Sequence, residues 1–228
     1  MPIDTQTGAD RAALDVARRL DVPHGGWIPK GRLAEDGPIS DKYELQEMPT
    51  ASYPKRTEQN VIDSDGTLIL SHGNLTGGSL YTKECADKHK LPCLHVNLDA
   101  TPADKAVTVI ADWIFKNEIE VLNVTGPRAS KDVKIYEANY NIINSVYWLC
   151  RVKAGTVNIK LDQPKTVDET VYQIIDELSL RDRAAYANLP EEKFLPLKYA
   201  LVIYLRDQLR HSAVNKELME DCIAKLGI

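Results

Sequence analysis

Three short segments of this chain combine glycine with hydroxyl or basic side chains, a mixture that suits the binding of an anion. They span residues 6–11, 75–79 and 125–130 of 228. Glycine lets a ligand approach the main chain closely, and the first turn of a helix offers free N–H groups and about half a positive charge. The segments therefore predict a site for phosphate or another oxyanion, which requires donors and charge but no general base.

The first segment opens a helix that is predicted by an apolar stripe over residues 13–20. Thr7 or Asp10 would cap this helix, Gly8 would leave room for a ligand and Arg11 would supply charge. A plain capped turn is the alternative interpretation of the same residues.

The second segment has the stronger pattern, because two adjacent glycines stand between a predicted strand and a predicted helix. Gly77 and Gly78 permit positive φ angles and close approach, while Thr76 and Ser79 add hydroxyl donors. We expect phosphate or oxyanion binding here.

The third segment follows another predicted strand and precedes a long predicted helix. It contains Gly126, Arg128 can make forked hydrogen bonds to phosphate, and Ser130 could cap the helix. A structural loop is the alternative interpretation.

A long basic and polar stretch joins the first two segments. It has little periodicity over about 25 residues, and connectors of that length in compact domains are usually binding loops or lids. Its cations Lys30, Arg32 and Arg56, together with Arg128, predict a local positive pocket in an acidic protein. Solvated loop charges are the alternative.

Short apolar strands alternate with helical patterns along the first two thirds of the chain. The strands are predicted at residues 67–70, 93–96 and 120–124, with a weaker one at 24–28, and a first strand is expected before Thr7. This alternation predicts an α/β Rossmann-like three-layer sandwich with a mostly parallel sheet. Ligands bind at the carboxyl edge of such a sheet, where the three segments should converge.

The chain changes character after a long helix that ends near Lys153. Residues 155–165 contain Gly155 and Pro164 without helical periodicity, and everything beyond reads as helix, including residues 216–226 and a Thr166-x-x-Glu169 capping box. We predict a ligand-binding domain at residues 1–154, a linker at 155–165 and a small all-α domain at 166–228.

Composition narrows the class of partner. The formal net charge is -5, so bulk charge does not attract nucleic acid or an anionic membrane. The sequence has neither a signal-peptide pattern nor an apolar run of about 18 residues, which would indicate a membrane span. The four cysteines lack CxxC spacing. They indicate reduced thiols in the cytoplasm, with a metal site formed by Cys85, His89, Cys93 and His95 as the alternative.

The ordered motifs resemble those of the molybdenum carrier, or molybdenum-cofactor carrier, proteins over residues 4–150. The matching residues are 6–17, His24-Gly25-Gly26-Trp27, Pro29-Lys30-Gly31-Arg32, 34–39, Arg56-Thr57, Asn60, Asp63-Ser64-Asp65, 75–78, Gly126-Pro127-Arg128 and Ser130. The chain looks more distantly like the LOG-type, lysine decarboxylase-like Rossmann proteins. Its tail resembles a small helical domain of unknown function.

The resemblance implies a homo-oligomer, a dimer or tetramer, that binds a phosphate-bearing pterin, the molybdenum cofactor (molybdopterin). The implied ligand-binding residues are Thr7, Gly8, Arg11, Lys30, Arg32, Arg56, Asn60, Asp63, Thr76, Gly77, Gly78, Ser79, Gly126, Arg128 and Ser130. The chain departs from the family where an apolar strand ending in two glycines usually precedes the first segment, because Met1-Pro2-Ile3-Asp4-Thr5 stands there instead.

Three functions are compatible with these residues, and a carrier of a small phosphorylated ligand is favoured. An N-glycosidic nucleotide hydrolase would need a carboxylate near the ribose, for which Asp10, Asp36, Asp63 and Asp65 are candidates. The catalytic LOG stretch Pro-Gly-Gly-x-Gly-Thr-x-x-Glu is not reproduced, and Glu84 is out of register. A nucleotide sensor coupled to the helical tail is the third possibility.

Overall fold

The computed structural model describes residues 8–154, 165–166, 168–169, 172–173, 203 and 216–226. Contacts divide the chain into two compact units, Met1–Ile143 and Asn144–Ile228. The division falls within one long helix. All of the residues that bear on the site below belong to the first unit.

A three-stranded parallel sheet forms the centre of the first unit. Its strands are β5 (Gly66–Ser71), β6 (Cys93–Asn97) and β7 (Leu122–Thr125), in the order β6-β5-β7. Every residue of β5 is buried, which explains why its central residues Leu68, Ile69 and Leu70 are consecutively apolar instead of alternating with polar ones. The strands predicted at residues 67–70, 93–96 and 120–124 are confirmed, although β7 begins later than predicted because Asp65 Oδ2 accepts hydrogen bonds from the amides of Glu120 and Val121. The strand expected before Thr7 lies outside the described residues.

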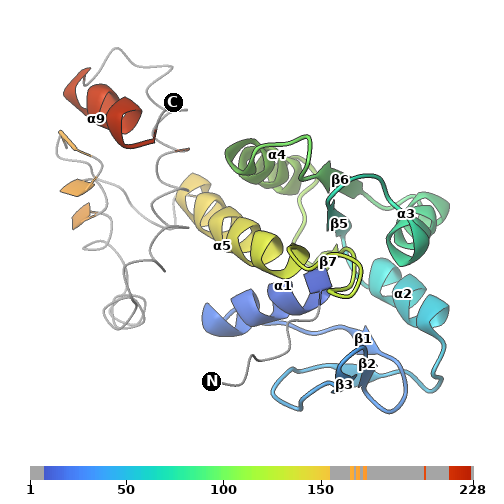
Figure 1. The fold of residues 1–228 in the computed structure, drawn as a ribbon. Coiled ribbons are helices and arrows are strands. Elements are labelled where there is room, and N and C mark those ends of the chain that lie inside the picture. Colours follow the sequence, from blue (N-terminus) through green and yellow to red (C-terminus); the bar gives the residue numbers. More distant parts are fainter. Residues whose placement is uncertain are drawn as a thin grey trace. The chain divides into compact units, whose positions relative to one another are not determined.

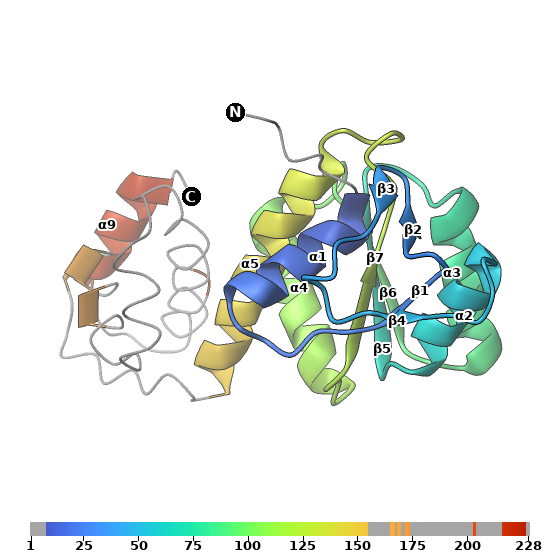
Figure 2. The same ribbon diagram turned by 90° about the horizontal axis from the view of Figure 1, so that it is seen from below.

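Helices cover both faces of this sheet. They are α1 (Gly8–Arg19), α2 (Tyr53–Ile62), α3 (Gly77–His89), α4 (Ala103–Lys116) and α5 (Ile135–Lys153). In Figures 1 and 2, α1, α4 and the start of α5 lie on one side of the sheet and α2 and α3 on the other. The prediction of a Rossmann-like three-layer α/β fold is confirmed.

Four very short strands lie in the basic stretch between α1 and α2. The strand β1 (Trp27–Ile28) pairs in parallel with β4 (Gln46–Glu47), and β2 (Leu33–Ala34) pairs antiparallel with β3 (Gly37–Pro38). The weak strand predicted at residues 24–28 is therefore limited to its last two residues.

The helix α2 corrects the sequence analysis, which treated its residues as part of an irregular connector. The hydroxyl of Ser52 caps the helix by accepting from the amide of Lys55 at 3.5 Å, and Pro54 fits the first turn. Val61 is the helix's buried residue, so the sequence shows little apolar periodicity. The Ser-x-Pro start was the available signal.

The described residues of the second unit agree with two local predictions. Thr166 Oγ1 accepts from the amide of Glu169 at 3.1 Å, as a capping box requires, although the Glu169 carboxylate accepts from the amide of Lys165. The predicted C-terminal helix is α9 (Lys216–Leu226). The predicted linker and most of the helical domain lie outside the described residues, so the domain boundaries remain predictions.

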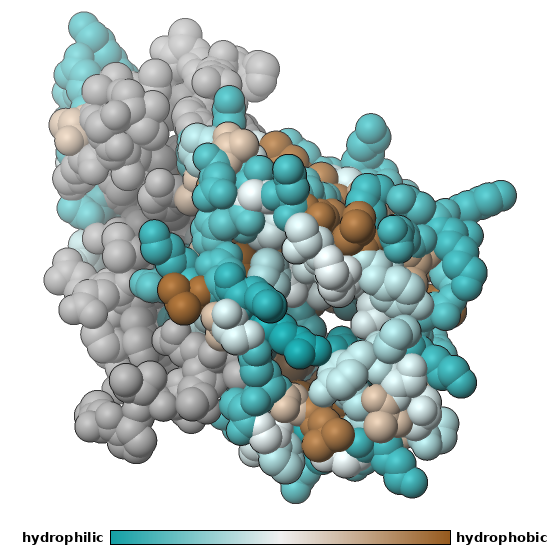
Figure 3. Space-filling model, turned by 45° about the vertical axis from the view of Figure 1, so that its right-hand side comes forward, coloured by the Kyte–Doolittle hydropathy of each residue, from teal (hydrophilic) through white to brown (hydrophobic). Residues whose placement is uncertain are grey.

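Large hydrophobic side chains reach the surface at scattered positions. Leu80 in α3, Val109 and Phe115 in α4, and Val121 just before β7 are each more than two-fifths exposed. The face drawn in Figure 3 is mostly hydrophilic, with hydrophobic residues in separate patches. Within the described part of the chain, no helix has the length and apolar character needed to cross a membrane.

Candidate functional site at the carboxyl edge of the sheet

The neighbouring strands β5 and β7 send their loops to opposite faces of the sheet. The loop after β5 leads to α3 on one face, and the loop after β7 leads to α5 on the other (Figures 1 and 2). Such a divergence opens a crevice beyond the carboxyl ends of the two strands, which is where open α/β sheets bind ligands. The second and third glycine segments lie in these two loops.

A short polar contact joins the two loops. His72, the residue after β5, places Nδ1 2.6 Å from Asp132 Oδ2 in the loop after β7. The loop after β5 is also tied to β6, because the amide of Gly73 donates to Asn97 Oδ1 at 2.9 Å. The carboxyl ends of all three strands are therefore connected by polar contacts.

The structure brings the first and third glycine segments together, but the chain itself fills the space beside them. A Cβ on Gly8 would lie 2.8 Å from Pro127 O, and one on Gly126 would lie 2.2 Å from Leu70 O and 2.7 Å from the Cβ of Ala9. The amide of Ala9 donates to Pro127 O at 3.2 Å. These two glycines allow backbone segments to pack against one another, whereas the sequence analysis assigned Gly8 to ligand approach.

The second glycine segment is open. No atom lies within 4 Å of a Cβ built on Gly77 or Gly78, and Gly77 has a φ of 52°. Thr76 occupies the N-cap position of α3, but its side chain makes no capping hydrogen bond. Within the described residues, no group accepts from the amides of Gly77, Gly78 or Ser79, so three N–H donors at this N-terminus are available.

Arg128 and Arg56 extend from the loop after β7 and from α2 respectively. The Arg128 guanidinium lies 5.2 Å from the centroid of the Tyr53 ring, and no carboxylate of the described residues pairs with it. Arg56 Nη1 lies 3.6 Å from Asp10 Oδ2 in the first turn of α1, and its buried Nε has no hydrogen-bond partner in the structure. Both arginines therefore retain donor capacity.

Other predicted residues lie in the same region but are engaged by acidic side chains. Arg11 Nη2 lies 3.5 Å from Asp36 Oδ1. Ser130 donates its hydroxyl to the Glu35 carboxylate, so the prediction that Ser130 caps the long helix is wrong. The helix begins later, at Ile135.

The aromatic contacts of α1 hold Arg11 in place. The Asp15 carboxylate accepts from the hydroxyls of Tyr43 at 2.6 Å and Tyr136 at 2.8 Å. Burial, reinforced by these hydrogen bonds, raises the pKa of both phenols well above the usual range, so both remain protonated donors. The Arg11 guanidinium lies over the Tyr43 ring, 5.2 Å from its centroid.

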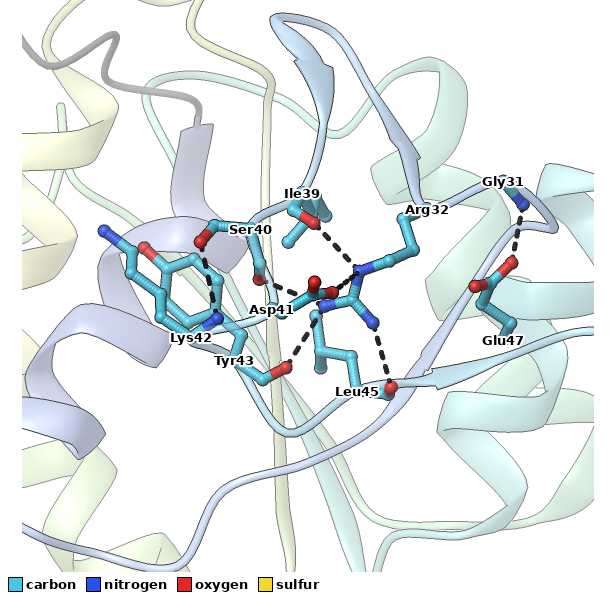
Figure 4. A network of polar contacts seen from close by, with 9 residues as sticks. All are labelled: Gly31, Arg32, Ile39, Ser40, Asp41, Lys42, Tyr43, Leu45 and Glu47. Carbon is cyan, nitrogen blue, oxygen red and sulfur yellow. Dashed lines mark hydrogen bonds and ion pairs between the residues drawn. The ribbon is translucent and has the colours of Figure 1, made fainter.

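Arg32 makes contacts that stabilise its own loop. Its guanidinium donates to the carbonyl oxygens of Ile39, Ser40, Tyr43 and Leu45 and lies near Asp41 (Figure 4). These partners use the donor capacity that the sequence analysis assigned to a ligand. Lys30, in contrast to Arg32, is an exposed residue, and its backbone amide donates to Thr50 O.

Asn60 and Asp63 hold Trp27 against α2. Asn60 Oδ1 accepts from the amide of Trp27 at 2.7 Å, and Asn60 Nδ2 donates to its carbonyl at 3.2 Å. Asp63 Oδ2 accepts from the Trp27 indole at 2.6 Å. Both polar side chains are thus committed to fixing β1.

The candidate carboxylates of a hydrolase already have partners. Asp10 pairs with Arg56, Asp36 with Arg11, and Asp63 with Trp27. Asp65 precedes β5 and therefore lies at the amino end of that strand, opposite the crevice. Ligand binding by these and the other predicted residues remains a prediction, and Thr7 lies outside the described residues.

The cysteine and histidine cluster makes ordinary polar contacts. His89 Nε2 lies 2.8 Å from Glu58 Oε1, and His95 Nε2 lies 2.9 Å from Ser71 Oγ. Burial raises the pKa of the Cys93 thiol to about 11. Among the described residues, no group of three His, Cys, Asp or Glu side chains is placed to hold a metal ion.

The residues that join the loops belong to none of the motifs recognised in the sequence. His72 directly follows a predicted strand, and Asp132 lies shortly after the third glycine segment, so position in the chain was the available signal. Tyr53 was missed because α2 was missed.

Comparisons with known proteins agree with this architecture. The sequence model of the circularly permutated YpsA SLOG family matches residues 4–147. A crystal structure from Syntrophus aciditrophicus SB, named "Putative molybdenum carrier protein", is similar at 55% sequence identity with a TM-score of 0.60, over 62% of this chain and 89% of that chain. No curated protein matches the sequence. The resemblance to molybdenum carrier and LOG-like proteins is confirmed.

Proposed function

Because the chain belongs to the circularly permutated YpsA SLOG family, we propose that it is a carrier that binds a small phosphate-bearing ligand at the N-terminus of α3. The observation that carries this proposal is the uncapped start of α3. Its exposed glycines and unpaired amides combine a partial positive charge with unhindered access, which suits a phosphate group.

The neighbouring arginines support the same ligand class. Arg128 is held over Tyr53 without a carboxylate partner among the described residues, so its forked donors can meet two phosphate oxygens. The orphaned Nε of Arg56 is a further donor. All of these donors belong to segments at the carboxyl edge of the sheet, where local positive charge favours an anion in a protein of net charge -5.

The ligand that we propose is molybdopterin, the organic part of the molybdenum cofactor. Its terminal phosphate fits the donor set of α3 and Arg128, and the similar structure from Syntrophus aciditrophicus SB carries the name of a molybdenum carrier. When bound, the cofactor would supply a pterin ring and a metal-binding dithiolene. The residues of this chain would bind and orient its phosphate. We also propose that the carrier acts as a homo-oligomer in the cytoplasm.

The test is mass spectrometry of small molecules retained by the purified full-length chain, from cells grown with and without molybdate. We expect a phosphorylated pterin on the native protein and none on the Gly78→Val variant, whose side chain would cover the free amides. The Gly25→Val variant is the control, because the nearest atom to a Cβ there is Glu44 O at 3.6 Å, an ordinary contact.

Two results would contradict the proposal. One is a phosphorylated ligand that is retained equally by the native protein and by Gly78→Val. The other is turnover of a nucleoside monophosphate to its free base, which would identify a hydrolase.

A further inference from the structure

A small pocket lies at the carboxyl edge, on the side of the sheet that α4 and α5 cover. It has a volume of about 240 Å³ and is lined by His72, Leu98, Thr101, Ala103, Ala138, Asn141 and Ile142. Most of this lining is apolar, with a few polar groups, as in sites that bind small organic molecules. None of these residues belongs to the glycine segments.

His72 gives the pocket a defined hydrogen-bonding group. The Asp132 carboxylate lies 2.6 Å from Nδ1, so in the neutral imidazole the proton resides on Nδ1 and Nε2 is an acceptor. No group of the described residues bonds to Nε2, and three-quarters of the side chain is buried. His72 therefore brings an unpaired acceptor to the lining of a mostly apolar pocket.

The pocket is close along the chain to the proposed phosphate site. His72 begins the loop that ends at the N-cap residue Thr76, and Asp132 belongs to the loop that carries Arg128. A volume of 240 Å³ is below the range of about 300–1,000 Å³ that holds a whole drug-sized ligand. It suits one ring system whose charged end lies outside.

We propose that this pocket holds the heterocyclic ring of the phosphorylated ligand, with His72 accepting a hydrogen bond from a ring N–H or amino group. This inference rests on the proposed function, because the phosphate would be bound at α3. Guanine is a suitable probe, since it shares the amino-oxo-pyrimidine edge of a pterin. A carrier would thereby distinguish its ligand from other phosphates.

The experiment compares the affinities of the full chain for guanosine 5′-monophosphate and ribose 5-phosphate by calorimetry. We expect the native protein to bind the nucleotide about tenfold or more tightly, because a buried hydrogen bond and an apolar ring contact are added. His72→Phe should lose about tenfold in affinity for the nucleotide and retain its affinity for ribose 5-phosphate. His89→Phe is the matched control.

A second variant is needed in case His72→Phe does not fold. Ala138→Leu leaves His72 and Asp132 intact but fills part of the pocket. It should therefore lower the affinity for guanosine 5′-monophosphate and leave the affinity for ribose 5-phosphate unchanged. Equal binding of the two probes by the native protein, or equal weakening of both by His72→Phe and Ala138→Leu, would overturn the ring site alone. Failure of the native protein to bind either probe would overturn both the phosphate site and the ring site that rests on it.

Discussion

Two pairs of glycines at one edge of the sheet have opposite surroundings. Gly8 and Gly126 lie against backbone atoms of other segments, whereas Gly77 and Gly78 have no atom within 4 Å of an added Cβ. Both pairs looked like ligand-binding glycines in the sequence. The comparison shows that a glycine after a strand can serve either the packing of the chain or access for a ligand, and the space beside its Cα distinguishes the two.

This difference assigns separate roles to neighbouring parts of the edge. The junction of α1 with the loop after β7 is a closed scaffold, in which the amide of Ala9 is already satisfied by Pro127 O. The N-terminus of α3 retains its free donors. Substitutions in the first region should therefore change stability, and substitutions in the second should change binding.

The largest effect is expected for Gly126→Ala. The new Cβ would lie 2.2 Å from Leu70 O, so β5 and the loop after β7 would have to separate. Overpacking of this kind costs about 3 kcal/mol or more. Urea unfolding should show this loss, whereas Gly78→Ala, the same change in open space, should leave the unfolding midpoint nearly unchanged. Equal midpoints for the two variants would remove the distinction between the regions.

Gly78→Val should give the next largest effect, on binding. The branched side chain would stand over the amides of α3 and reduce the affinity for ribose 5-phosphate by about a hundredfold, or 2.7 kcal/mol. Calorimetry measures the loss, and unfolding should show that the fold is retained. Native affinity in this variant would exclude the N-terminus of α3 from the site.

Arg128→Ala should weaken binding of the same probe by about tenfold, because a charge-assisted hydrogen bond is lost. The difference from the native protein should shrink as salt is added, since screening weakens the attraction. Lys131→Ala removes an exposed charge from the same loop and is the control. An unchanged affinity in Arg128→Ala would show that Arg128 does not bind the ligand and serves only to contact Tyr53.

Glu58→Gln should have the smallest effect. Hydrogen bonds from Lys88 and His89 lower the pKa of Glu58, so this contact between α2 and α3 stabilises the fold above the carboxylate's unfolded pKa. The stabilisation is lost as pH falls through the folded pKa. Unfolding midpoints measured from neutral to acidic pH should therefore fall more steeply for the native protein than for Glu58→Gln. Parallel curves would contradict this assignment.

The fold was largely predictable from the sequence, because the buried strand β5 has a consecutive apolar centre and α5 has a clear helical stripe. The helix α2 was not, since it buries little apolar surface. The position of the site at the carboxyl edge of the sheet was predictable, but the hydrogen-bond and ion-pair partners of each residue were not. Arg32 and Arg128 look equivalent in sequence, yet one is surrounded by carbonyl oxygens and the other is not.

Long-range contacts determine the role of each residue at the site, and these contacts cannot be predicted from a single sequence. The approach of Glu35 to Ser130 and of Leu70 to Gly126 depends on how loops cross at the edge of the sheet. His72 and Asp132, 60 positions apart, meet for the same reason.

The most direct measurement is a two-dimensional NMR amide spectrum of the full chain titrated with ribose 5-phosphate. We predict that the amide resonances of Gly77, Gly78 and Ser79 shift with saturation, while that of Ala9, already bonded to Pro127 O, stays in place. A shift of Ala9 without any change at Gly77, Gly78 and Ser79 would contradict the account, because the ligand would then occupy the region that we describe as closed.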